Sequence, residues 1–324
     1  MPTRKGGLRL QGADKSEGIG RSHSPSHITG FFTIRLSPDP LRSGSTGAGI
    51  CLKDGVKTTV RLMPPEEPQS FVSCGAELPL PPTCRSVVER MLGARAPFSF
   101  RAEQSVSFPP NYGYGISGAS ALSLAMALEK ALGSSPSKAA EIAHLAEIEN
   151  LTGLGDVIAE HAGGFELRTK PGAPGFGEVR RLDHPRGVFV ISSPVLSFPT
   201  SRMISEEGYV RPINSFGEEA IAAFTESPTL DNFMLQSRRF WERVGVPDGS
   251  VRAAVRVFEK GGVKNPSAKK GVVFGIVSES EVEGVVRSIT GAPFRMEGRP
   301  PFNIKDNSHG LRIMISEISE EGAC

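Results

Sequence analysis

Residues 110–133 read PNYGYGISGASALSLAMALEKALG, a loop of glycine and small hydroxyl residues that runs directly into an apolar segment. The apolar residues of that segment cover nearly the whole circumference of a helix, which is typical of a buried helix. At the start of a helix, free backbone N–H groups and the positive end of the dipole favour an anion such as phosphate. The stretch therefore predicts a helix over about 117–132 behind a phosphate-binding loop. The residues expected to hold the phosphate are Gly113, Gly115, Ser117, Gly118, Ala119 and Ser120.

The loop also matches three other patterns in part. Its glycines match G-x-G-x-x-G, but Pro109 and Pro110 precede them, and two prolines do not fit the central strand that a dinucleotide site requires. An acidic residue at the end of a second strand, about 20 positions on, is also missing. The P-loop pattern fails because Ala119 stands where its lysine would be. A purely structural loop, with Ser117 as the N-cap of a buried helix, stays open.

The length and composition indicate a globular protein of ordinary type. The 324 residues suffice for two domains, and 38% are hydrophobic and 22% charged. The net charge of +2 gives no general attraction to nucleic acid or membrane, so we expect neither partner. The basic pairs Lys269-Lys270 and Arg238-Arg239 lack interleaved aromatic residues, which favours solvated faces. Four cysteines without a C-x-x-C pair, and no long apolar run, predict a reducing, cytoplasmic location. The oligomeric state is open, with a homodimer among the alternatives.

The order of apolar and turn-forming segments predicts an α+β chain in two domains. We expect a disordered extension over 1–21, an N-terminal domain over 22–198 and a C-terminal α+β domain over 199–324. The Asp54-Gly55 pair predicts a tight hairpin within 50–62, because Asp-Gly favours such turns. Further helices are expected near 137–150, 218–224, 230–244, 251–259 and 279–289, and strands near 31–36, 97–108, 165–168, 187–192, 271–277 and 311–315.

A second motif, AEIENLTGLGD over 146–156, places acidic residues downstream of the loop. Phosphoryl transfer needs a phosphate cradle, carboxylate and hydroxyl ligands for Mg²⁺, and a carboxylate near the attacking hydroxyl. Ser117 and Glu147 suit the metal, Asp156 suits the hydroxyl, and Arg168 suits a carboxylate on the acceptor. Each also has a simpler interpretation. Asp156 would be a helix N-cap, Glu147 an exposed helix charge, and Arg168 an arginine at a strand edge.

The loop resembles the central motif of the galactokinase–homoserine kinase–mevalonate kinase–phosphomevalonate kinase (GHMP) superfamily, Pro-x-x-x-Gly-Leu-Gly-Ser-Ser-Ala. That motif appears here as Pro110, the run 113–117 and Gly118-Ala119. Within the superfamily, the chain resembles the archaeal pantoate kinase family over about 22–315. The third, glycine-rich motif is poorly kept, with 264–268 and Gly271 near its expected place. The similar segments are SHITGFF (26–32), GSTGAG (44–49), TGLGD (152–156), GGFELR (163–168) and PGAPG (171–175).

The resemblance implies a fold with an N-terminal domain like ribosomal protein S5 domain 2 and a ferredoxin-like C-terminal domain, with ATP in the cleft between them. It implies ATP- and Mg²⁺-dependent phosphorylation of the 4-hydroxyl of pantoate to 4-phosphopantoate, on the route to coenzyme A. Two alternatives remain: a kinase of another small hydroxy acid or alcohol, and an inactive nucleotide-binding sensor.

The resemblance also implies roles for single residues. Ser117 and Glu147 become Mg²⁺–phosphate ligands and Asp156 the catalytic carboxylate, with Glu149 a close rival of Glu147. The residues implied to bind the acceptor are Arg168, His27 and Thr46.

Overall fold

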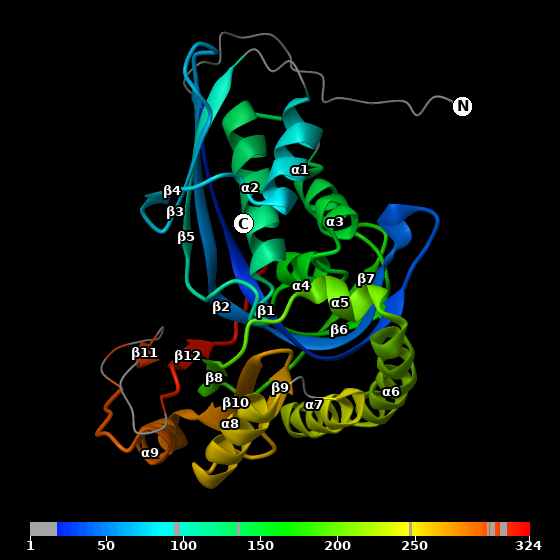
Figure 1. The fold of residues 1–324 in the computed structure, drawn as a ribbon, viewed down its shortest axis with the longest axis vertical. Helices are drawn as coiled ribbons and strands as arrows, with labels where there is room; N and C mark the ends of the chain where they lie inside the picture. Colours follow the sequence, from blue (N-terminus) through cyan, green and yellow to red (C-terminus); the bar gives the residue numbers. More distant parts are fainter. Residues whose placement is uncertain are drawn as a thin grey trace.

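The computed structural model describes residues 18–93, 98–134, 137–245, 248–296, 298, 302–304 and 310–324. Most of the extension expected over 1–21 lies outside these residues. Its last part is not an extension, because Ile19 to Arg21 already belong to the first strand and pair with residues 59–61. Two β-sheets with helices packed on them are stacked along the long axis (Figure 1). None of the helices in the described part of the chain is long and apolar enough to cross a membrane.

The first sheet is built on two long antiparallel strands, β1 and β2. The other edge of β2 pairs with β5 along its C-terminal half and with β6 along its N-terminal half. The order of the described strands is β4-β3-β5-β2-β6-β7, with β1 on β2. Their bounds are β1 (Ile19–Arg35), β2 (Gly44–Met63), β3 (Ser70–Ser73), β4 (Ala76–Glu77), β5 (Ser99–Val106), β6 (Phe165–Lys170) and β7 (Glu178–Leu182), with a short 3₁₀ helix, η1 (Pro40–Arg42), between β1 and β2.

The hairpin predicted at Asp54-Gly55 is wrong, because β2 runs through this pair without turning. Opposite it, the register shifts between Pro25 and Ser26, so β1 and β2 form a bulge here. A Cβ on Gly55 would collide with the carbonyl oxygen of Ser24. Pairing over the whole length of two long strands therefore outweighs the local turn preference, and the glycine permits the close approach of the bulge.

Helix α2 (Ile116–Leu132) confirms the buried helix predicted behind the loop. It packs against β1 and β2 on one side and against α1 (Pro82–Leu92) and α3 (Ala139–Asn150) on the other. Alanine fills much of the contact, and the α2 backbone lies so close to β1 that a Cβ on Gly20 would collide with the Ala127 carbonyl. Helix α4 (Asp156–Ala162) packs beside the first turns of α2.

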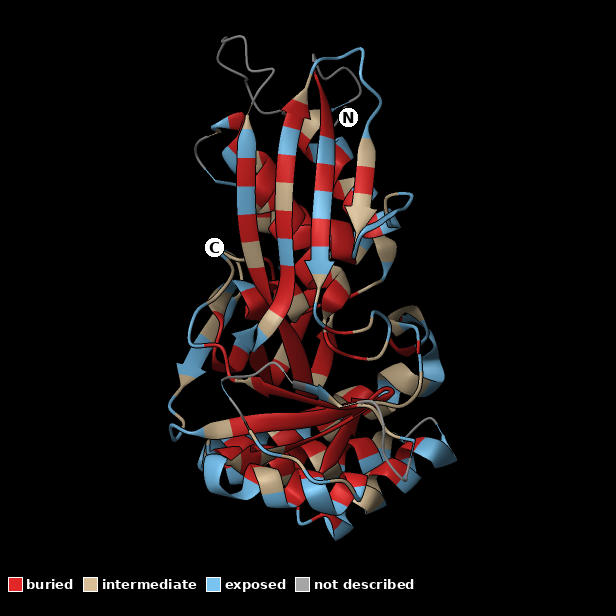
Figure 2. Cartoon of the chain, turned by 90° about the vertical axis from the view of Figure 1, so that its left-hand side faces the viewer, coloured by how far each residue is buried: buried red, intermediate tan, exposed pale blue. Residues whose placement is uncertain are grey.

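The second sheet has the order β11-β12-β8-β10-β9 in the described part of the chain. Its strands run across those of the first sheet, with α8 and α9 beneath them (Figure 2). In the first sheet, β5 and the outer ends of β1 and β2 alternate between buried and exposed residues (Figure 2). The parts of β1 and β2 nearer the second sheet, and the central strands of the second sheet, are buried nearly throughout. The bounds are β8 (Val188–Pro194), β9 (Ser267–Lys269), β10 (Val272–Ser278), β11 (Phe302–Ile304), β12 (Ile313–Glu317), α8 (Gly249–Lys260) and α9 (Glu279–Thr290).

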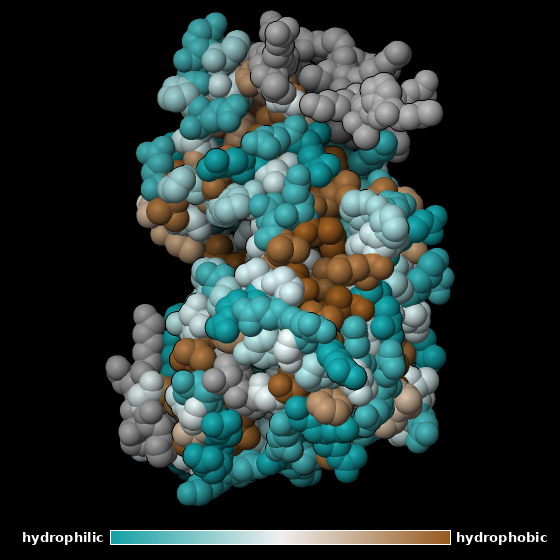
Figure 3. Space-filling view, turned by 45° about the vertical axis from the view of Figure 1, so that its right-hand side comes forward, coloured by the Kyte–Doolittle hydropathy of each residue, from teal (hydrophilic) through white to brown (hydrophobic). Residues whose placement is uncertain are grey.

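Three further helices, α5 (Thr200–Ser205), α6 (Glu207–Glu226) and α7 (Leu230–Val244), join the two layers. An aromatic cluster holds α6 and α7 to β1, with the Phe31 ring centroid 5.4 Å from that of Phe224 and 6.0 Å from that of Phe233. Beside α3, α4 and α5, hydrophobic residues gather at mid-height of the surface, bordered by hydrophilic ones (Figure 3).

The predicted fold class is confirmed as α+β with two sheets. The change of sheet falls between β7 and β8, before the domain boundary predicted at 198/199. The C-terminal end of the chain returns to the first sheet, where Cys324 and His23 exchange backbone hydrogen bonds of 2.9 Å. The division at 198/199 into two units stays a prediction.

Candidate active site

The glycine-rich loop ends at the N-terminus of α2, where Gly115 is the N-cap in a left-handed conformation with φ of 70°. Ser117 lies inside the first turn and makes no capping hydrogen bond, so the interpretation as an N-cap is wrong. Gly118 sits where α2 meets α4, because a Cβ there would lie 3.3 Å from the Cβ of Asp156. The loop and the second acidic motif therefore meet, as the sequence predicted.

Glu147 is buried on the last turn of α3, with 2% of its surface exposed. Its Oε1 accepts a hydrogen bond of 2.6 Å from the Thr152 hydroxyl, and the Ser117 hydroxyl lies near enough to the carboxylate to lower its pKa. Its Oε2 has no hydrogen-bond partner among the described residues. Burial is the main reason that the pKa of Glu147 rises to about 7. The rival Glu149 is exposed and pairs with Arg90 at 3.0 Å.

Asp156 is the first residue of α4, but its N-cap is Gly155, so the capping interpretation of Asp156 is also wrong. Its Oδ1 lies 2.8 Å from Nδ1 of His27 and 3.3 Å from Nζ of Lys269. Burial alone would raise the Asp156 pKa, but Lys269 and His27 hold it well below its usual range. Gly153 brings Asp156 and Glu147 together, since a Cβ there would touch the carboxylate oxygens of both.

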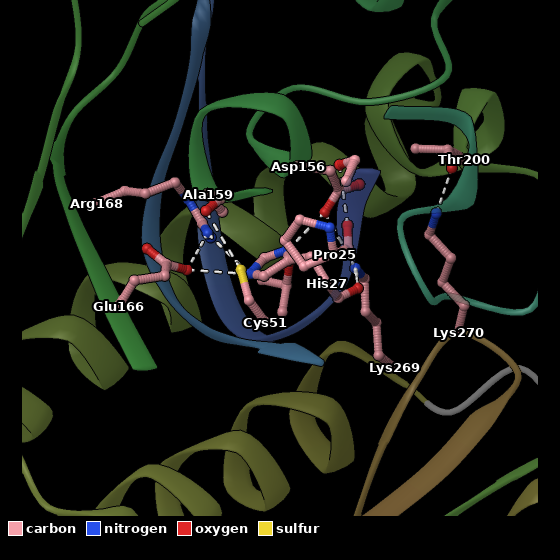
Figure 4. Close-up of polar contacts among 12 residues, drawn as sticks. Pro25, His27, Cys51, Asp156, Ala159, Glu166, Arg168, Thr200, Lys269 and Lys270 are labelled. Atoms are coloured by element: carbon pink, nitrogen blue, oxygen red, sulfur yellow. Dashed lines mark hydrogen bonds and ion pairs between the residues drawn. The ribbon is translucent and has the colours of Figure 1, made fainter. Parts of the chain in front are cut away.

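His27 on β1 is fully buried and connects Asp156 to an ion pair on the side away from Lys269 and Lys270 (Figure 4). Its Nε2 lies 3.0 Å from Oε1 of Glu166 and 3.3 Å from Nη1 of Arg168. Arg168 donates to Glu166, and both side chains are buried. Arg168 Nε lacks a hydrogen-bond partner among the described residues and lies against Gly155. Because Glu166 and Arg168 are two residues apart in one strand, they share a face, a signal present in the sequence.

The structure corrects the expectation that Lys269 and Lys270 form a solvated face. Only 4% and 8% of their surfaces are exposed, and both enter the site from the second sheet. Lys269 donates to Asp156 and to the carbonyl oxygen of His27, and Lys270 donates to the Thr200 hydroxyl (Figure 4). Burial, followed by the charge of Lys269, lowers the Lys270 pKa to about 8. The sequence could not show this burial, because it depends on how the sheets stack.

Relatives of this chain are found among known kinases. The family model described as GHMP kinases N terminal domain matches residues 83–164, from α1 to beyond α4. The chain is 33% identical over 276 residues to the pantoate kinase of Thermococcus kodakarensis, covering 81% of this chain and 89% of that relative. It is 32% identical over 227 residues to the pantoate kinase of Methanocaldococcus jannaschii, covering 69% and 80%. The chain belongs to the pantoate kinase family of GHMP kinases.

The structural comparison agrees with this family. A solved structure described as a phosphotransferase related to the CoA biosynthesis pathway has a TM-score of 0.80 and 28% identity, covering 94% of this chain and 98% of that one. As a member of a kinase family, the chain uses ATP. The predicted GHMP fold is therefore confirmed.

A small pocket of about 40 Å³ opens beside Asp156 at the junction of the two sheets. Thr46, predicted for the acceptor, is not among its lining residues, because its hydroxyl bonds Thr33 at 2.6 Å. Its neighbour Ser45 lines the pocket instead, since successive side chains in a strand point to opposite faces. The lining residues are Thr29, Phe32, Ser45, Gly153, Leu154, Gly155, Asp156, Thr200, Trp241, Lys269 and Lys270.

Glu160 on α4 is a buried carboxyl group directly behind the phosphate loop. A Cβ on Gly115 would lie 2.5 Å from its Oε1, and one on Gly118 would lie 2.8 Å from its Oε2. Neither oxygen has a hydrogen-bond partner in the described ranges. Burial, then the charge of Asp156, raises the Glu160 pKa well above its usual range. The neutral form therefore adds no negative charge behind the loop.

Proposed function

We propose that this chain transfers the γ-phosphoryl group of ATP to the 4-hydroxyl of pantoate, which yields 4-phosphopantoate for coenzyme A biosynthesis. The observation that carries the proposal is the Asp156 carboxylate. Lys269 and His27 keep it ionised where the N-terminus of α2 and Glu147 meet. A carboxylate at this point can orient a hydroxyl toward a phosphate held by the α2 amides.

In the proposed reaction, a bond forms between the 4-oxygen of pantoate and the γ-phosphorus, and the bond from that phosphorus to the β–γ bridging oxygen breaks. ADP leaves, and the hydroxyl proton passes to Asp156 and then to solvent. A carboxylate with a lowered pKa is a weak base. It suffices here because the transition state of phosphoryl transfer is loose and needs little proton abstraction. The main contribution of Asp156 is therefore to position the hydroxyl.

The residues around Glu147 fit Mg²⁺. A buried carboxylate oxygen without a partner, beside the Ser117 hydroxyl, forms the hard oxygen donor set that this ion prefers. We propose Glu147 and Ser117 as its protein ligands. The ion, when bound, neutralises phosphate charge. The exposure of Glu149 and its ion pair with Arg90 support Glu147 over Glu149 for this role.

The pocket beside Asp156 fits pantoate in chemistry. Phe32, Leu154 and Trp241 offer apolar contact to the two methyl groups of pantoate. For the acceptor carboxylate we propose Arg168, whose unpaired Nε faces the pocket wall at Gly155. A pocket of about 40 Å³ holds little more than a water molecule, so the acceptor must displace long side chains as it enters.

The test is ADP release by the purified protein with ATP and Mg²⁺, using pantoate, pantothenate and mevalonate as separate acceptors. We expect turnover with pantoate alone, and its loss in Asp156→Asn. Turnover with another acceptor would move the reaction to a different substrate, and ATP binding without any turnover would favour a sensor. The cytoplasmic location and the homodimer stay predictions.

A further inference from the structure

The phosphate loop carries no cation of its own. Ala119, fully buried in α2, occupies the position at which a P-loop has its lysine. Backbone N–H groups and the helix dipole supply only partial positive charge to the phosphates. Negative charge develops on the phosphoryl group during its transfer, and a full cation positioned in advance stabilises that charge best. Such a cation has to come from a segment packed against the loop.

The turn between β9 and β10 brings two lysines to the loop. The carbonyl oxygen of Lys269 lies so near Gly113 that a Cβ there would be 2.6 Å away. Lys270 has a positive φ of 57°, and Gly271 follows it where a Cβ would collide with the Leu196 carbonyl. The second sheet therefore fixes this turn against the phosphate loop, and both ammonium groups enter the site from one side (Figure 4).

The two lysines have different partners. The Lys269 ammonium is occupied, because it contacts the Asp156 carboxylate and the His27 carbonyl oxygen. The Lys270 ammonium contacts the neutral hydroxyl of Thr200, and no carboxylate of the described residues lies within 4 Å of it. Lys270 lines the same pocket as Asp156 and Gly153, and Gly153 lies against the carboxylates of Glu147 and Asp156, so the ammonium is in reach of the acceptor side and the phosphate side alike. A buried ammonium without a counter-ion is poised for an anionic ligand.

We propose that Lys270 binds the γ-phosphoryl group of ATP and stays with it during transfer, as the full cation that the loop lacks. Lys269 keeps Asp156 oriented beside it. Thr200 holds the Lys270 ammonium until the nucleotide arrives. The inference rests on the proposed function for the identity of the acceptor, but not for the binding of the triphosphate.

The experiment compares nucleotide binding by calorimetry in the presence of Mg²⁺. The variants are Lys270→Met and Lys270→Arg, and Lys260→Met serves as a matched control at an exposed position of α8. The ligands are AMP-PCP, which carries a γ-phosphate, and ADP, which does not. We expect Lys270→Met to weaken AMP-PCP ten- to hundredfold, the range of a charge-assisted hydrogen bond, and to change ADP less than twofold. Lys270→Arg should keep much of the preference for AMP-PCP.

Steady-state kinetics with ATP and pantoate give a second readout. A role with the transferred group predicts that Lys270→Met lowers kcat and leaves the KM for pantoate nearly unchanged. Equal weakening of AMP-PCP and ADP would overturn the proposal, as would a rise in the KM for pantoate alone, since Lys270 would then hold the acceptor. If the wild type fails to phosphorylate pantoate, the calorimetry still decides the role of Lys270, so the two failures are distinguishable.

Discussion

Lys270 should destabilise the protein in the absence of a ligand, and its removal should therefore raise the free energy of unfolding. The pKa of this lysine falls from an ordinary value of 10.5 to about 8, mainly through burial. At 1.36 kcal/mol per pKa unit, the cost of keeping the folded protein charged at pH 7 is about 3 kcal/mol. Lys270→Met removes that charge but leaves the Thr200 hydroxyl without its partner, a loss of about 1 kcal/mol. We expect a net gain of about 2 kcal/mol.

The direction in which stability changes with pH follows from the same pKa. Between about pH 8 and 10.5 the unfolded chain binds this proton and the folded chain does not, so the wild type regains stability as the pH rises through that window. The assay is urea denaturation of the wild type, Lys270→Met and Lys260→Met at pH 7 and pH 10. The advantage of Lys270→Met should be large at pH 7 and small at pH 10, while Lys260→Met stays within about 0.5 kcal/mol of the wild type. A Lys270→Met protein less stable than the wild type at pH 7 would refute the reasoning.

Three further predictions follow from the buried carboxylates and their partners. The pKa of Glu160 is raised in the folded protein, so wild-type stability falls as the pH rises above the ordinary carboxyl pKa. In urea denaturation, the free energy of unfolding of Glu160→Gln should match that of the wild type near pH 4.5 and exceed it at pH 8. Equal denaturation curves for the two proteins at both pH values would contradict this. Arg168→Met leaves Glu166 buried without its cation, so it should lower the free energy of unfolding in denaturant by about 3–5 kcal/mol. Adding Glu166→Gln should restore most of that stability. A double variant as unstable as Arg168→Met alone would show that lost packing causes the effect. Asp156→Asn should lower kcat about 10²- to 10⁴-fold in the ADP-release assay while Glu149→Gln stays within about twofold, and a large loss in Glu149→Gln would return the metal role to that residue.

Local sequence signals were reliable where one segment decides its own structure. The helix predicted over 230–244 is α7, and the apolar segment behind the loop is α2. Periodicity of apolar residues suffices for such helices, because each buries one continuous surface. The signals failed where a distant strand competes with a local preference. Asp54-Gly55 favours a turn, but pairing with β1 continues on both sides of it, and only a bulge forms there.

In the candidate site, too, local motifs were predictable and contacts between distant segments were not. By itself the sequence determined the glycine-rich loop before α2, the acidic motif with Asp156 and Glu147, and the family of kinases to which they point, because these residues lie in contiguous motifs. Only the tertiary structure decided that Lys269 and Lys270 belong to the site, that Ser45 replaces Thr46 in its wall, and that Arg168 pairs with Glu166 on the side away from these lysines. The lysines lie more than 100 residues after Asp156 in the chain, and their position depends on the stacking of the second sheet on the first. Burial and ion pairing between distant segments are properties of that packing, so no local pattern records them.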